Sequence, residues 1–84
     1  MVEEEQVTFR NKADMRVQAQ MSTGRTLVST CLAEPGEIHI LKSGSVRHDI
    51  YFKNAAIGWK VASRRENETK TISLRRLKGH FILS

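Results

Sequence analysis

The feature that most constrains the fold is an alternation of apolar and polar residues that recurs in short runs along the chain. Successive side chains of a β-strand point to opposite faces, so this period of two predicts strands with one buried face. The runs are rich in Val, Ile, Thr and aromatic residues, as strands usually are. The residues expected to face inward are Val7 and Phe9; Met15, Val17, Ala19 and Met21; Ile38 and Ile40; Val46, His48, Ile50 and Phe52; Trp59 and Val61; Ile72 and Leu74; and Phe81 and Leu83.

Clusters of Gly, Pro, Asn, Asp and Ser separate these runs at intervals of roughly 8 to 12 residues, a spacing typical of β-sandwiches and barrels. The sequence therefore predicts eight strands, near residues 6–11, 15–22, 26–33, 37–42, 46–54, 59–65, 70–76 and 80–84. The segment from Leu74 to Gly79 is the one candidate for a helix. Because β-branched residues precede it and it is short, strand–turn–strand is the favoured interpretation.

With 84 residues, the chain is long enough for one domain with a small core. We predict an all-β fold, a small antiparallel β-sandwich of seven or eight short strands, and prefer a sandwich to a barrel. The pattern, with Pro35-Gly36 in a turn between two strands, resembles that of immunoglobulin-like and related sandwich domains. Residues 1–5 are expected to form an acidic, disordered tail, and residues 6–84 the sandwich domain.

The composition, 39% hydrophobic and 27% charged, is that of a globular chain. The single cysteine, Cys31, excludes an internal disulfide and a cysteine-framed metal site. The start Met-Val-Glu-Glu-Glu differs from a signal peptide, and no apolar run is long enough to span a bilayer. These features predict a cytoplasmic protein and no transmembrane segment.

No arrangement of residues typical of an active site is present. The three histidines His39, His48 and His80 are not spaced as local metal ligands, and His48 and Asp49 point to opposite faces of a strand. Cys31 lies in an apolar run that is expected to be buried, where a thiol is usually inert. We therefore predict a protein that is not an enzyme and has no cofactor, although a metal site assembled from distant strands stays open as a weaker alternative.

Charge is distributed unevenly along the chain. Residues 1–41 contain four Lys/Arg and six Asp/Glu, whereas residues 42–84 contain ten Lys/Arg and three Asp/Glu, so the halves carry −2 and +7. If the strands near residues 60 and 73 form a hairpin, their basic residues make a cationic strip that attracts a polyanion. The alternative is an ordinary solvated surface. The expected polyanion-binding residues are Lys60, Arg64, Arg65, Lys70, Arg75, Arg76 and Lys78.

The segment from Lys53 to Lys60 is unusual because the loop that it contains is apolar, whereas loops are normally polar. One interpretation is that this tip docks on a partner, a sugar ring or a membrane interface. The other, which the small core favours, is that Ala56, Ile57 and Trp59 fold down and close one end of the core. The expected partner-contact residues are Tyr51, Lys53, Asn54, Ile57 and Trp59.

The resulting functional prediction is a non-enzymatic binding module whose basic C-terminal half binds a polyanion, with nucleic acid as the first choice. The alternative is a protein–protein adaptor or inhibitor, including one that binds an acidic protein or that self-associates through an edge strand or the 54–59 loop.

Overall fold

A computed structural model describes residues 5–43 and 47–84 of the chain, and the described residues form eight strands. Residues 1–4 of the expected tail, the expected inward residue Val46, and Gly44 and Ser45 lie outside this part. The strands are β1 (Glu5–Lys12), β2 (Val17–Thr23), β3 (Thr26–Ala33), β4 (Ile38–Ser43), β5 (His48–Asn54), β6 (Lys60–Asn67), β7 (Thr71–Leu77) and β8 (His80–Leu83).

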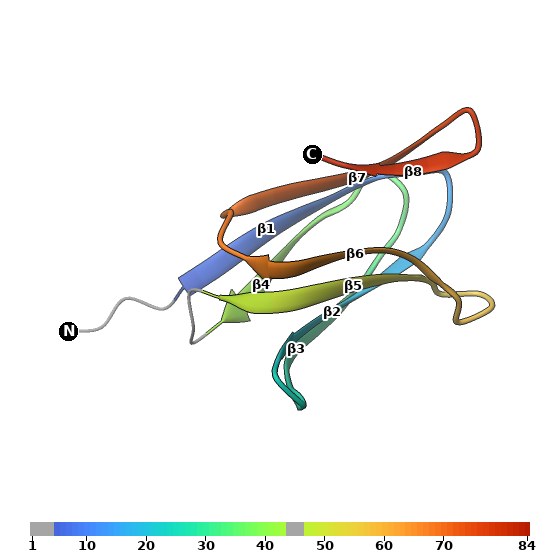
Figure 1. Cartoon of the computed structure of the whole chain (residues 1–84). Coiled ribbons are helices and arrows are strands. Elements are labelled where there is room, and N and C mark those ends of the chain that lie inside the picture. The colour runs from blue at the N-terminus through green and yellow to red at the C-terminus, as the bar shows by residue number, and fades with distance from the viewer. Residues whose placement is uncertain (1–4, 44–46) are drawn as a thin grey trace.

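The strands form two packed four-stranded sheets, which confirms the predicted β-sandwich (Figure 1). The strand order is β4-β1-β7-β8 in the first, here called sheet A, and β3-β2-β5-β6 in the second, sheet B. This order is not the ABED and CFG order of immunoglobulin domains, so the likeness to them is one of architecture. The pairing of β1 with β7 is parallel, which makes sheet A mixed, whereas the other strand pairings are antiparallel.

The core lies between the sheets and contains most of the residues expected there. Phe9 of sheet A and Phe52 of sheet B are fully buried, and their ring centroids are 4.9 Å apart. This aromatic contact joins the two layers at the centre of the molecule. The buried apolar residues are Val7, Phe9, Ala13, Val17, Ala19, Met21, Ala33, Leu41, Ile50, Phe52, Ile72 and Leu74.

The predicted orientation of β4 is wrong. Ile38 and Ile40 are 56% and 58% exposed, whereas Leu41 is buried and His39 is half-buried. The reason is the register with β1, because Leu41 lies opposite the buried Val7 and must share its inward direction.

The apolar run of β3 is also less buried than expected. Leu27, Val28 and Leu32 are exposed, and Cys31 is half-buried against the core. Because β3 is an edge strand of sheet B, it has a neighbouring strand on one side only.

The predicted hairpin between the two basic strands does not form. β6 pairs with β5 in sheet B, whereas β7 lies between β1 and β8 in sheet A. The buried Asn67 holds the crossover between the sheets, because its amide Nδ2 donates to Thr69 O at 2.9 Å and its Oδ1 accepts from Thr69 Oγ1 at 2.6 Å. Immediately afterwards Lys70 O accepts a hydrogen bond from Thr8 N at 2.8 Å, which commits the chain to sheet A.

The segment near Leu77 is a turn between two strands, as predicted. Leu77 pairs with His80, so Lys78 and Gly79 form a two-residue turn in which both residues have positive φ, 51° and 81°. These angles suit a type I′ hairpin turn, whose twist matches that of the flanking strands.

Candidate binding surfaces at the loop end

Strand pairing gathers four connections at one end of the sandwich. Val17, the first residue of β2, lies opposite Ala33 and Asn54, the last residues of β3 and β5. Lys12 at the end of β1 lies beside Arg75 near the end of β7. The connections 13–16, 34–37, 55–59 and 78–79 therefore share this end, which we call the loop end and which lies away from the N-terminus in Figure 1.

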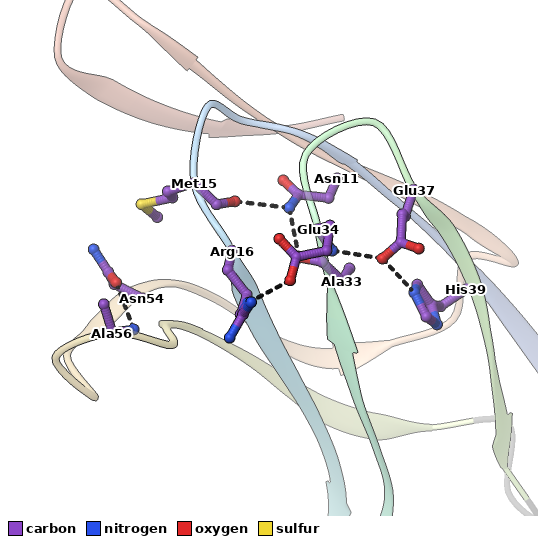
Figure 2. A network of polar contacts seen from close by, with 9 residues as sticks. All are labelled: Asn11, Met15, Arg16, Ala33, Glu34, Glu37, His39, Asn54 and Ala56. Carbon is purple, nitrogen blue, oxygen red and sulfur yellow. Dashed lines mark hydrogen bonds and ion pairs between the residues drawn. The ribbon is translucent and has the colours of Figure 1, made fainter.

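The β5–β6 loop is held firmly at the loop end by Asn54. Its backbone N donates to Trp59 O at 2.8 Å, its backbone O accepts from Gly58 N at 2.7 Å, and its Oδ1 accepts from Ala56 N at 2.9 Å. The last contact is visible in Figure 2. Gly58 has a φ of 75°, a conformation that suits glycine. Asn54, predicted as a partner contact, thus builds the loop.

This anchored loop displays its apolar side chains to solvent. Ile57 is 63% exposed and Trp59 is 73% exposed. The interpretation that they fold down to close the core is therefore wrong. The loop is held in place by Asn54 and by a bond from Ala55 N to Arg16 O of 3.1 Å, without burial of its apex.

Beside the loop, the outer face of sheet B carries two lysines and a tyrosine. Lys53 lies directly opposite Lys60 on the neighbouring strand, and Lys60 Nζ is 5.5 Å from the centroid of the Tyr51 ring. Like charges placed directly opposite each other are destabilising. The cation–π contact with the half-buried Tyr51 offsets part of this cost.

The outer face of sheet A repeats this arrangement at the same end. Lys12 lies beside Arg75 in the parallel register, and Arg10 lies on the same face two residues before Lys12. Each of the three is exposed, and residues 6–12, 38–42, 71–77 and 80–83 of this sheet contain no Asp or Glu. The sequence prediction missed Arg10 and Lys12 because they belong to the half of the chain with net negative charge. Only the long-range β1–β7 pairing brings them to Arg75.

The other predicted cations at this end are placed differently. Arg76 lies with its guanidinium 5.4 Å from the centroid of Phe81 and its Nη1 4.0 Å from Asp14 Oδ1. Lys78 is at the exposed β7–β8 turn. Five cations of the loop end make no ion pair within the described residues, namely Lys12, Lys53, Lys60, Arg75 and Lys78.

The remaining predicted polyanion-binding residues, Arg64, Arg65 and Lys70, lie toward the opposite end. Arg64 Nη1 donates to Thr69 Oγ1 at 3.3 Å. Carboxylates are close by in this region, since Glu68 pairs with Arg47 at 2.6 Å. The structure thus divides the predicted basic set into two groups rather than one strip.

The thiol and the histidines do not assemble into a group. The described residues contain no cluster of three or more His, Cys, Asp or Glu side chains that suits a metal ion. Burial raises the pKa of the Cys31 thiol, which disfavours the nucleophilic thiolate. The buried His48 lies with its Nε2 3.3 Å from Asn67 Nδ2, beside an open polar hollow of about 210 Å³ that Ser22, Arg47 and Glu66 help to line.

The chain matches no known protein-family model, and comparisons with curated proteins and with solved structures find no match. Within residues 5–43 and 47–84, no helix has the length and apolarity that crossing a membrane requires.

Proposed function

We propose that this protein is a non-enzymatic binding module and that its loop end binds a polyanion, with single-stranded nucleic acid as the ligand. The observation that carries the proposal is the presence of two like-charge pairs, Lys53 with Lys60 and Lys12 with Arg75, at the same end of the two sheets. Phosphate groups placed between such cations turn repulsion into attraction, and release of their counterions favours binding.

The exposed aromatic side chain beside one of these pairs favours a single strand over a duplex. Trp59 precedes Lys60 in the chain and is 73% exposed on an anchored loop. Single-strand binders combine basic residues, which contact phosphates, with aromatic side chains on which bases stack. Trp59 is the stacking residue in this proposal, and the Tyr51 ring holds Lys60 in position through the cation–π contact.

The main test measures binding of a fluorescent single-stranded oligonucleotide over a series of salt concentrations. Replacing Lys53, Lys60 and Arg75 by Gln should lower the slope of log K against log salt by about 2, since each phosphate contact on a single strand contributes about 0.7. The matched control replaces Arg64, Arg65 and Lys70 by Gln, which removes the same charge from the opposite end. Equal losses in the two variants, or none in the first, would contradict a site at the loop end.

Stacking is tested separately with Trp59→Ala. A lost base stack costs about 1–3 kcal/mol, so affinity should fall by roughly five- to 150-fold while the salt slope is unchanged. A duplex of the same sequence provides the control, because its bases are not available to Trp59. A variant that binds both ligands as the wild type does would remove Trp59 from the site.

A second candidate function, binding of a protein partner, is favoured by Ile57. This residue is 63% exposed within an apolar loop, and nucleic acid offers it few apolar contacts. Ile57→Asp should abolish capture of such a partner and leave oligonucleotide binding intact. Loss of oligonucleotide binding in this variant would instead place Ile57 in the nucleic-acid site.

A further inference from the structure

The four sheet edges of this protein differ in how they are protected against pairing with another chain. Exposed strand edges usually carry charges or are short. β6 includes Lys60, Arg64 and Arg65, β4 includes Lys42, and β8 has only four residues. β3 has eight residues, TLVSTCLA, and none of them is charged. It is the least protected edge among the described strands.

β3 also exposes apolar side chains to solvent. Leu27, Val28 and Leu32 are 56%, 39% and 49% exposed. The register with β2 shifts between Met21, which faces Ser29, and Ser22, which faces Leu27, so Val28 is the extra residue of a β-bulge. Because of this bulge, Leu27 lies on the same outer face as Leu32, although they are five positions apart and would lie on opposite faces of a regular strand.

We propose that β3 pairs antiparallel with β3 of a second copy of this chain, about a two-fold axis at Thr30. Because Val28 is bulged out of the ladder, side chains that face the core lie opposite core-facing side chains of the second copy in this register. Side chains that face solvent likewise lie opposite solvent-facing ones. Two such strands extend sheet B into one continuous sheet, and their edge backbone groups become hydrogen-bonded. The pairs across the interface are Thr30 with Thr30, Ser29 with Cys31, Leu27 with Leu32, and Thr26 with Ala33.

The charges at the two ends of β3 favour a second copy as the occupant. The same register places Arg25, which precedes β3, opposite Glu34, which follows it in the second copy. Arg25 makes no ion pair with the described residues of its own chain, and Glu34 pairs with Arg16. By the two-fold symmetry, the dimer therefore contains two Arg25–Glu34 pairs of opposite charge, one at each end of the interface. No like charges lie opposite each other along the paired strands.

The inferred interface is independent of the proposed nucleic-acid surface. Ala33 of β3 is at the loop end, so antiparallel pairing directs the two loop ends away from each other. Both loop ends remain accessible in the dimer, and a failure of either proposal leaves the other unaffected.

The experiment is sedimentation velocity of the full chain over a wide concentration series, with each variant also checked by circular dichroism. Wild type should dimerise, and Leu27→Lys should raise the dimer dissociation constant by about tenfold or more, because it puts lysine opposite leucine twice. The double variant Leu27→Lys/Leu32→Glu puts opposite charges across both sites and should restore the dimer. Ser63→Lys, the same charge change on the exposed side of β6, should leave it unchanged.

Several results would overturn the inference. A wild type that stays monomeric at every concentration excludes the dimer. A dimer that Leu27→Lys does not weaken lies elsewhere on the molecule. If Leu27→Lys is a folded monomer and the double variant is also monomeric, the two strands do not pair in this register.

Discussion

Asn11 is the residue on which most of the loop end depends. It is fully buried, and its amide Nδ2 donates to Met15 O and Ala33 O, each at 2.9 Å (Figure 2). Its Oδ1 accepts from Ala13 N at 3.0 Å. These bonds join the end of β1 to the next turn and to the end of β3. A single side chain thus satisfies three backbone groups, which would be costly to bury unpaired.

Asn11→Ala should destabilise the protein by about 2–4 kcal/mol, because it leaves several buried polar groups without a partner. Urea unfolding followed by far-UV and by near-UV circular dichroism measures this loss. Asn11→Asp is the informative control, because it keeps the acceptor for Ala13 N but loses both donors, and it should also be destabilised. An unchanged midpoint in Asn11→Ala would show that water replaces the amide at little cost.

At the scale of elements, the connection between β3 and β4 is held in place by the carboxylate of Glu37, a residue of the connection itself. Glu37 Oε1 accepts from Glu34 N at 2.7 Å and lies 3.3 Å from His39 Nε2. The hydrogen bond from the Glu34 backbone, with a smaller contribution from His39, lowers the pKa of Glu37 below its usual value of 4.5. The folded state therefore favours the ionised form of this side chain.

The stability that Glu37 contributes should consequently depend on pH. It is fully present above about pH 4.5 and is lost as pH falls through the lower pKa of the folded state. The difference in unfolding free energy between wild type and Glu37→Gln should thus stay constant from pH 7 to about 5 and shrink below about 4.5. Urea titrations at several pH values measure it. A difference that is the same at pH 7 and pH 3 would contradict the role of this carboxylate.

The positions of the strands could be predicted because they depend on residues that are close together in the sequence. Alternation and turn residues located all eight strands. In β1, β2 and β5 the apolar residues fall mainly in one of the two alternating sets, such as Val17, Ala19 and Met21, and this set identified the inward positions. In β4 both alternating sets contain apolar residues, so alternation alone does not choose between Ile40 and Leu41. The pairing with β1, a long-range interaction, makes that choice.

The candidate site was less predictable for the same reason. The apolar loop around Trp59 was visible in the sequence, but its exposure depends on the hydrogen bonds of Asn54, which hold it open. The grouping of cations depends on which strands are neighbours. Arg64 and Arg75 were expected to lie close together in a hairpin. The crossover after Asn67 places them in different sheets instead. The parallel β1–β7 pairing brings Lys12 beside Arg75.

At the scale of the whole molecule, stability depends on the contact between the two sheets. A domain of this size buries only about 60–65% of the surface of its unfolded chain, so each large core residue matters. Phe9 and Phe52 are the largest fully buried side chains, and they face each other across the layers with their rings tilted by 40°. This geometry adds a specific aromatic interaction to the hydrophobic contact.

A double-mutant cycle tests whether this contact couples the two sheets. Phe9→Leu and Phe52→Leu should each destabilise the protein, and the double variant should lose about 0.5–1.5 kcal/mol less than the sum, because the aromatic interaction is lost only once. Phe81→Leu is the matched control for Phe52→Leu, since the Phe81 ring contacts the guanidinium of Arg76 and should combine additively with Phe9→Leu. All free energies come from urea unfolding with two probes. If Phe9 and Phe52 are also additive, the sheets are held together by burial of apolar surface alone, and other residues of matching volume would serve equally well at this contact.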